Sequence, residues 1–248
     1  MDNCPLVLPF LRNFCEQTDT SSISFCIFIT HSRKHDILQH LVHIEVAKIA
    51  EKNGLYIIED EIFSDFEYVP APRYLTLLGL KQVIQIGSFT KTLSAAIRCG
   101  YIIAQEEMID QLIDLNIATH FNTSHLNAEI IYQALIDSSY LRHIEWLKKQ
   151  LQKTMSETVK KLAVLGIYPV ILPKAGIFLW CQLPVHIDAA KLSQLCLDKG
   201  IILAPGNSFS QSKNAAQFIR FNAAQCIDKK VFDVLAAALN ELNLRAAV

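Results

Sequence analysis

The chain has 248 residues, of which 51% are hydrophobic, and its formal net charge is −1. This length and composition predict a globular protein of one large or two small domains and exclude a disordered chain. A charge near zero, without clustered basic residues, argues against a general affinity for nucleic acid or anionic membranes.

Targeting signals and cysteine spacing bear on where the protein works. No stretch reaches the roughly 18 uninterrupted apolar residues that a membrane helix needs. The start, MDNCPLVLPFLRNFCEQ, lacks the positive first region and the long apolar centre of a secretory signal. The seven cysteines are scattered, without the repeated short spacings of disulfide frameworks or zinc sites. These features predict a cytoplasmic protein with reduced thiols and no membrane partner.

Short apolar runs rich in β-branched residues alternate with a helical pattern in the first half of the chain. The runs that predict strands are 22–30, 55–63, 82–89 and 99–104. Residues 40–54 have helical spacing and end at Gly54. Alternation of this kind predicts an α/β fold with a mostly parallel sheet covered by helices.

The middle of the chain changes to a helical pattern. Residues 123–166 contain no proline, and apolar positions recur at steps of three and four. This pattern predicts two helices or one long bent helix, with a break at 137–139 and an end at Gly166.

The last part of the chain predicts a second, smaller α+β region. Its strands are expected at 175–184, 200–206 and 217–224, with helices between and after them. The expected domains are a partial large domain at 1–120, connecting helices at 121–165 and a small α+β domain at 166–248.

The stretch IGSFTKTLSAAIRCGYI, residues 86–102, places Lys91 between two hydroxyls at the end of a predicted strand. A phosphate-binding P-loop needs glycine six residues before its lysine and directly before it, and these positions are Gln85 and Thr90. A lysine in this place can instead form an imine with an aldehyde cofactor, of which pyridoxal phosphate is the common one. The alternative is an exposed strand exit without a chemical role.

A pyridoxal phosphate site needs further groups beside its lysine. Hydroxyls of Ser88 and Thr90 and the guanidinium of Arg98 are near in sequence and suit the phosphate. Asp60, at the end of the preceding strand, suits the pyridine nitrogen, because the protonated ring is the electron sink. Functional sites lie at the carboxyl ends of such strands, so we expect Asp60 beside Lys91. The alternative interpretation is a solvated turn of three consecutive acids.

These segments resemble motifs of a known family. GSFTKTLSAAIRCGYI resembles the lysine segment of fold-type I aminotransferases, and YIIEDEIFSDF resembles their aspartate segment. YLRHIEWLKKQLQKTMSETVKKL resembles their long helix, and LPKAGIFLWCQLP, KGIILAPGNSFS and FIRFNAA resemble their small-domain strands. The motifs keep the family's order over residues 22–245, and the likeness is closest to the aminotransferase-like domain of MocR-type regulators of the GntR family. It implies the α/β fold of type I pyridoxal-phosphate transferases, class I/II, with an incomplete large domain.

The resemblance also implies a role for each site residue. Lys91 would bind the aldehyde of pyridoxal 5′-phosphate and move a proton between the substrate Cα and the cofactor C4′. Asp60 would pair with the pyridine nitrogen, and Arg220, in FIRFNAA, would bind the substrate α-carboxylate through its planar fork. The residues implied to hold the phosphate are Ser88, Thr90 and Arg98.

Two local departures from the family pattern weaken the implied site. Phe63 stands where the family has a tyrosine that hydrogen-bonds the cofactor's phenolic oxygen, a bond worth roughly 0.5–1.5 kcal/mol. The segment ITHSRKHDIL lacks the asparagine turn that also reaches this oxygen. The histidines of this neighbourhood are expected to be surface residues rather than metal ligands, since no acid or cysteine recurs at ligand spacing; they are His31, His35, His40 and His43.

A third departure lies upstream. The family's glycine-rich turn, which grips the phosphate at a helix N-terminus, has no counterpart in residues 1–30, and the whole chain has only 8 glycines. The resemblance therefore implies a chain shortened at its N-terminus. Losing two charge-assisted hydrogen bonds would weaken cofactor binding by about 100- to 10⁴-fold.

Three functional hypotheses follow. The first is an aminotransferase that exchanges an amino group between an amino acid and a 2-oxo acid, as a homodimer by resemblance. The second is a non-catalytic ligand-sensing or interaction module, a remnant of a MocR-like regulator with no DNA-binding domain in this chain. The third is a gene product without activity.

Overall fold

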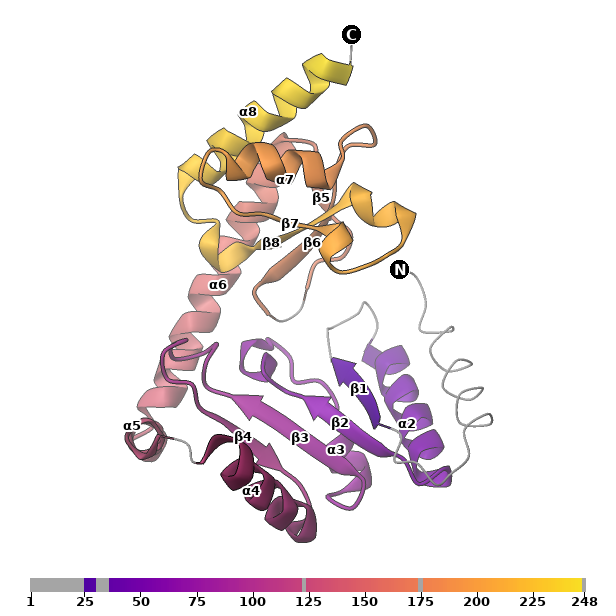
Figure 1. Ribbon diagram of the computed structural model, residues 1–248, viewed down its shortest axis with the longest axis vertical. Helices are drawn as coiled ribbons and strands as arrows, with labels where there is room; N and C mark the ends of the chain where they lie inside the picture. The colour runs from indigo at the N-terminus through magenta and orange to yellow at the C-terminus, as the bar shows by residue number, and fades with distance from the viewer. Residues whose placement is uncertain (1–24, 30–35, 122–123, 174–175, 247–248) are drawn as a thin grey trace. The chain divides into compact units, whose positions relative to one another are not determined.

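The computed structural model describes residues 25–29, 36–121, 124–173 and 176–246. The chain divides into two compact units, residues 1–144 and 145–248. Each unit contains a four-stranded sheet, with strand order β1-β2-β3-β4 in the first and β5-β6-β8-β7 in the second (Figure 1).

The sheet of the first unit is mostly parallel. Its strands are β1 (Phe25–Ile29), β2 (Tyr56–Asp60), β3 (Val83–Ser88) and β4 (Gly100–Ile103). β1, β2 and β3 are parallel neighbours, and β4 pairs antiparallel with β3. The predicted strands and the predicted mostly parallel sheet are therefore confirmed.

Helices α2 and α3 cover one face of this sheet. α2 (Asp36–Lys52) ends just before Gly54, whose φ of +61° favours glycine, as the sequence predicted. α3 (Tyr74–Leu78) contacts α2, β2 and β3. The core consists of the apolar side chains that these elements bring together: Val46, Ala47, Ala50, Leu55, Ile57, Tyr74 and Val83.

Two further helices complete the first unit. α4 (Glu106–His120) follows β4, and α5 (His125–Ile136) follows α4; a 3-10 turn, η1 (Ser64–Phe66), lies between β2 and α3. The sequence pattern did not predict α3 or α4. α3 is only one turn long, too short for a periodic pattern to be recognised. α4 does have apolar residues at helical spacing, although none of them is buried, and no helix was assigned there from the sequence.

The predicted break in the long helical segment is confirmed. α5 ends at Ile136, and α6 (Ser139–Val164) begins after Ser138, whose φ of +59° cannot continue a helix. Gly166, with φ of +72°, follows the end of α6. The boundary between the two compact units falls within α6.

The second unit is an antiparallel α+β structure. Its strands are β5 (Tyr168–Pro169), β6 (Phe178–Gln182), β7 (Ala204–Pro205) and β8 (Phe218–Asn222). Its helices are the greater part of α6, α7 (Ala189–Leu197) and α8 (Lys229–Ala246), with short 3-10 turns η2 (Gly206–Ser208), η3 (Lys213–Gln217) and η4 (Ala223–Gln225). The strand expected at 200–206 is reduced to the two residues of β7.

Alternation along β6 and β8 separates two faces of the second sheet. Leu179 of β6 and its register partner Phe221 of β8 are buried in the core with residues of α7 and α8. Trp180 and its partner Arg220 point to the opposite face, since side chains alternate along a strand. Arg220 is therefore outside the apolar core.

No helix in the described ranges has the length and apolar character of a membrane span.

Candidate functional site

The carboxyl ends of β2 and β3 bring two predicted site residues to one place. Asp60 ends β2, Ser88 ends β3, and Asp60 is the register partner of Ile86. Register partners of neighbouring strands share a face, and so do residues two apart on one strand. Asp60 and Ser88 therefore lie at the same edge and on the same face of the sheet.

Lys91 lies on an ordered turn just beyond Ser88. The N–H of Thr90 donates to Ser88 Oγ at 3.1 Å, and the N–H of Leu93 donates to the Phe89 carbonyl at 2.9 Å. Lys91 itself is exposed, and its amine makes no hydrogen bond or ion pair with any residue that the structure describes. An accessible, unpaired amine on a fixed backbone is suited to attack an aldehyde.

Arg98 has a backbone conformation that is unusual for its residue type. Its φ of +44° lies in the left-handed region, which costs a non-glycine residue about 1–3 kcal/mol and occurs most often at functional sites. The neighbouring Ile97 carbonyl accepts from Asn127 Nδ2 at 2.9 Å, and the Cys99 carbonyl accepts from Ser88 Oγ at 3.4 Å. The Arg98 side chain is exposed and has no ion-pair partner among the described residues.

Asp60 and Phe63 occupy the turn that follows β2. Asp60 is half-buried, and its Oδ1 accepts from the Ile62 N–H at 3.0 Å. It forms no ion pair within the described part of the chain. Phe63 is also half-buried, with its ring 6.1 Å from that of Phe66. The turn thus carries the Asp60 carboxylate without a cation beside it. It also carries the phenyl ring of Phe63 at the position where the family has a tyrosine.

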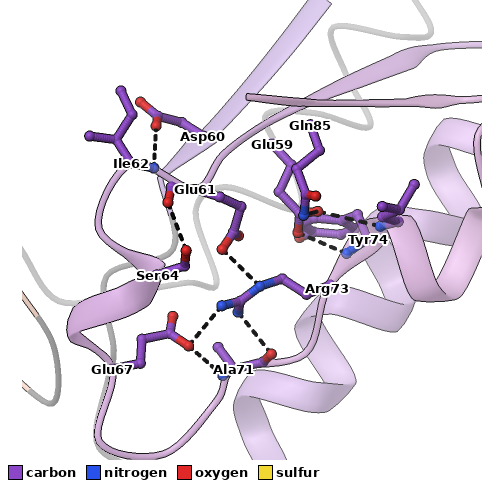
Figure 2. A network of polar contacts seen from close by, with 11 residues as sticks. Glu59, Asp60, Glu61, Ile62, Ser64, Glu67, Ala71, Arg73, Tyr74 and Gln85 are labelled. Carbon is purple, nitrogen blue, oxygen red and sulfur yellow. Dashed lines mark hydrogen bonds and ion pairs between the residues drawn. The ribbon is translucent and has the colours of Figure 1, made fainter. Parts of the chain in front are cut away.

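The acids on either side of Asp60 are buried, which corrects their interpretation as a solvated turn. Glu59 points to the face covered by α3, where its carboxylate accepts from the N–H groups of Tyr74 at 2.8 Å and Leu75 at 3.4 Å (Figure 2). A carboxylate satisfies the unpaired N–H groups at a helix N-terminus and interacts favourably with its dipole. Glu59 therefore ties β2 to α3.

One guanidinium holds two further carboxylates of this segment. Arg73 Nε lies 2.8 Å from Glu61 Oε2, and Arg73 Nη2 lies 2.8 Å from Glu67 Oε2. Arg73 Nη1 also donates to the Ala71 carbonyl at 2.8 Å, and the Ala71 N–H donates to Glu67 (Figure 2). The network fixes the chain from the end of β2 to the start of α3.

Glu61 is the acid of this network whose burial is least offset by hydrogen bonds and ion pairs. Its Oε1 is buried without a hydrogen-bond partner among the described residues. Burial, together with the smaller effects of the nearby Glu59 and Glu67, raises the pKa of Glu61 to about 7 against the lowering effect of Arg73. Because Arg73 is shared with Glu67, its charge does not fully offset this burial. The residue that follows Asp60 thus titrates near neutral pH.

The first turn of α6 contacts the residue next to Lys91. The hydroxyl of Tyr140 lies 3.0 Å from Thr92 Oγ1, and His143 Nε2 lies 2.7 Å from the Thr92 carbonyl. No local pattern in the sequence marks Tyr140, His143 or Arg73 as a site residue. Tyr140 and His143 do lie in the long-helix segment that resembles the family, whereas Arg73 lies outside all of the resembling segments.

Arg220 is held between two aromatic rings on the open face of the second sheet. Its guanidinium carbon lies 4.2 Å from the ring centroid of Phe178 and 4.3 Å from that of Phe209. It has no carboxylate partner among the described residues. Stacking leaves the N–H groups in the plane of the guanidinium available, so Arg220 can accept a carboxylate in a fixed orientation. The other predicted site residues belong to the first unit.

The structure describes only part of the segment that contains the four histidines. His43 is buried and stacks on Tyr74 with ring centroids 4.7 Å apart, so its expected surface position is wrong. His31 and His35, like most of the segment expected to replace the asparagine turn, lie outside the described residues, as do residues 1–24. In the described ranges, no group of three or more histidines, cysteines or acids could hold a metal ion.

The chemistry of the donor set fits pyridoxal phosphate. An unpaired amine is present for the aldehyde, a carboxylate without a cation for the ring nitrogen, and hydroxyls with an arginine for the phosphate. These groups are Lys91, Asp60, Ser88, Thr90 and Arg98.

Comparison with protein families and curated proteins agrees with this chemistry. Residues 42–239 match the model of the family "Aminotransferase class I and II". The HTH-type transcriptional regulator NorG of Staphylococcus aureus is 29% identical over 211 residues, which cover 83% of this chain and 46% of the relative. The uncharacterized HTH-type transcriptional regulator YdfD of Bacillus subtilis is also 29% identical, over 73% of this chain and 38% of that protein. The chain thus spans about half the length, or less, of these relatives.

Two solved aminotransferase structures share the fold of this chain. The kynurenine aminotransferase of Pyrococcus horikoshii aligns with a TM-score of 0.79 at 18% identity, over 95% of this chain and 60% of its own. LysN, the alpha-aminoadipate aminotransferase of Thermus thermophilus, aligns with a TM-score of 0.72 at 21% identity, over 84% of this chain and 56% of its own. The fold is therefore that of fold-type I pyridoxal-phosphate aminotransferases.

Proposed function

Because the chain belongs to the class I and II aminotransferase family, whose cofactor is pyridoxal 5′-phosphate, we propose that it is an aminotransferase-type protein. Its reaction would be the exchange of an amino group between an amino acid and a 2-oxo acid. The observation that carries the proposal is the exposed, unpaired Lys91 on an ordered turn, beside the sheet edge where Asp60 and Ser88 share a face.

Each residue of the donor set has a separate task in this proposal. The Lys91 amine would hold the cofactor through its aldehyde carbon until the amino group of the substrate displaces it from that carbon. The freed amine would then take the proton from the substrate Cα, for which it must have no competing ion pair. Asp60 accepts from the protonated ring nitrogen, and bound pyridoxal phosphate then supplies an electron sink for the bonds at Cα. The phosphate is bound by Ser88, Thr90 and Arg98.

Arg220 is proposed to select substrates by their α-carboxylate. Its guanidinium carbon lies over the rings of both Phe178 and Phe209, which restrict the side chain, and a carboxylate binds the planar guanidinium through two parallel hydrogen bonds. An amino acid and a 2-oxo acid share this carboxylate, so one arginine serves both halves of the exchange. Substitution Arg220→Lys keeps the charge but loses the fork and is expected to raise KM for both substrates.

The half-reaction tests the proposed activity. The protein loaded with pyridoxal phosphate is mixed with single amino acids, and the 2-oxo acid formed is measured as one equivalent per loaded site. Formation of the 2-oxo acid that disappears in Lys91→Ala supports the proposal. Loaded protein that yields none from any of the common amino acids contradicts it.

The alternative proposal is a ligand-sensing module without turnover. The curated relatives are named as transcriptional regulators, and Phe63 lacks the hydroxyl of the family tyrosine. In this case, amino acids would change the absorbance of the Lys91-bound cofactor and raise the melting temperature, but no 2-oxo acid would form. The same titration therefore separates the two functions.

Self-association belongs to the proposal as well. Members of the aminotransferase family commonly work as homodimers, and we expect the same here. Light scattering coupled to size-exclusion chromatography checks this, with a 27.9 kDa monomer at micromolar concentration as the contrary result.

A further inference from the structure

Thr92 connects the turn that carries Lys91 to the first turn of α6. Its side chain is only 2% exposed, although Lys91 beside it is exposed. Thr92 Oγ1 lies 3.0 Å from the Tyr140 hydroxyl and 3.3 Å from the Phe89 carbonyl oxygen. The Thr92 carbonyl lies 2.7 Å from His143 Nε2, which must carry the proton because a carbonyl can only accept.

Tyr140 is itself fixed from several sides. Its hydroxyl donates to the Asp65 carboxylate, and its ring packs edge-on against Phe89, with centroids 5.6 Å apart. Tyr140 and His143 are three residues apart on α6, so they lie on the same side of the helix. Burial and the bond to Asp65 raise the pKa of Tyr140 far above neutral, so its hydroxyl remains a donor at physiological pH.

Counting protons gives this chain of contacts a direction. Tyr140 and Thr92 contribute one hydroxyl proton each. Tyr140 donates its single proton to the Asp65 carboxylate, so the Thr92 hydroxyl is the donor in its contact with the Tyr140 oxygen. The Phe89 carbonyl keeps the bond from the Leu93 N–H at 2.9 Å. The Asp65 carboxylate, on the turn after β2, thus orders the hydroxyl of Tyr140 and, through it, that of Thr92 on the turn after β3.

We propose that Tyr140 is a positioning residue for Lys91, acting through Thr92. The inference concerns the turn at 89–93 and, in its consequence for cofactor binding, rests on the proposed function. The Lys91 side chain has no hydrogen-bond or ion-pair partner in the described part of the chain. The position of its amine is therefore set by the backbone of this turn. Thr92 is the residue of the turn that reaches into the buried interior.

Substitution Tyr140→Phe removes one oxygen and keeps the ring against Phe89. The first measurement is hydrogen–deuterium exchange of the amides of residues 90–93 in protein without cofactor. We expect exchange to be about 2- to 12-fold faster, the range for one neutral hydrogen bond. Tyr132→Phe is the matched control, because Tyr132 of α5 is exposed, and should leave this exchange unchanged. Unchanged exchange in Tyr140→Phe overturns the inference.

The second measurement follows the Lys91-bound cofactor. In Tyr140→Phe, we expect pyridoxal phosphate to bind about 2- to 12-fold more weakly and the pH midpoint of its absorbance band to move. Faster exchange with unchanged affinity and midpoint would contradict positioning. Wild-type protein that binds no cofactor at Lys91 contradicts the proposed function instead, while the exchange experiment still decides whether Tyr140 holds the turn.

Thr92 provides an independent pair of variants. Thr92→Val keeps the shape but loses the hydroxyl, so it should reproduce the faster exchange, and Thr92→Ser should restore the wild-type rate. If the two residues act as one unit, Thr92→Val adds nothing in a Tyr140→Phe background. Full additivity of the two substitutions would overturn the inference.

Discussion

Most of the proposed site in the first unit is built from two segments: residues 60–67, at the end of β2 (the β2 exit), and residues 87–93, at the end of β3 (the β3 exit). Different interactions hold these two segments in place. The β2 exit is fixed by charges, since Arg73 lies between the buried carboxylates of Glu61 and Glu67. The β3 exit is fixed by hydrogen bonds between uncharged groups, chiefly from the Thr92 hydroxyl to Tyr140 and along the backbone of the turn.

This difference predicts how each exit fails. Breaking a buried ion pair leaves an uncompensated charge, which is costly and depends on pH. Losing one hydrogen bond between uncharged groups lowers the free energy of unfolding by less and leaves its pH dependence unchanged. The variants below test the contrast, in order of decreasing expected effect.

Substitution Arg73→Met is expected to have the largest effect. It leaves Glu61 and Glu67 buried without their cation, which should lower the free energy of unfolding by about 3–5 kcal/mol at pH 8. Urea denaturation measures this change. The control Lys81→Met removes an exposed cation and should cost less than about 0.5 kcal/mol. Equal effects of the two variants would show that the charges do not hold the β2 exit.

Glu61 makes the stability of the β2 exit depend on pH. The folded protein keeps a proton on Glu61 up to about pH 7, whereas the unfolded chain loses it near the ordinary pKa of 4.5. The folded state therefore binds more protons within this interval, and the free energy of unfolding falls as the pH rises through it, by up to about 3 kcal/mol.

Substitution Glu61→Gln should remove this fall. Urea midpoints measured from pH 4.5 to 8 would then change less in the variant than in wild type. Glu67→Gln removes the other carboxylate on Arg73 and should leave the fall in place. An identical pH profile of wild type and Glu61→Gln would contradict the raised pKa.

Gly87 probes packing at the β3 exit. A Cβ at this position would collide with the ring of Tyr101, its register partner on β4. Gly87→Ala is expected to lower the free energy of unfolding by about 1–3 kcal/mol, because the ring must move. In a Tyr101→Ala background, the added methyl group should cost almost nothing. If Gly87→Ala lowers the free energy of unfolding equally in that background, the backbone at residue 87, and not the Tyr101 ring, disfavours the methyl group.

Phe63→Tyr should have the smallest effect, and it should be a gain. A hydroxyl that reaches the phenolic oxygen of the cofactor would add one neutral hydrogen bond of about 0.5–1.5 kcal/mol, or about 2- to 12-fold in affinity. Titration of the Lys91-bound absorbance measures it. The gain should vanish with an analogue that lacks the phenolic oxygen, and an equal gain with that analogue would refute the assigned contact.

Much of the fold could be predicted because its signals are local. Glycine marked the ends of α2 and α6, apolar runs marked β2 and β3, and the polar break at 137–139 separated α5 from α6. The exposed helix α4 was missed although its apolar residues recur at helical spacing. β7 was overestimated, because an apolar run does not say how many of its residues pair with a neighbouring strand.

The site divides in the same way. The roles of Asp60, Ser88 and Lys91 remain a proposal, but the positions of the first two at strand ends, with Lys91 just beyond, could be predicted because all three stand in short motifs. Arg73 and Tyr140 could not, since Tyr140 meets Thr92 across 48 residues of sequence and Arg73 is an ordinary arginine until Glu61 and Glu67 are buried beside it. The burial of Glu59 and Glu61 was missed because charged residues are rarely buried without such partners.

The covalent use of Lys91 is tested most directly by trapping. The protein is incubated with pyridoxal phosphate, reduced with borohydride and digested, and the modified peptide is identified by mass spectrometry. The account predicts one modification, on Lys91, at a concentration of cofactor that leaves the exposed Lys81 unmodified. Folded protein whose modification is spread evenly over its surface lysines, or that is not modified on Lys91, would contradict it.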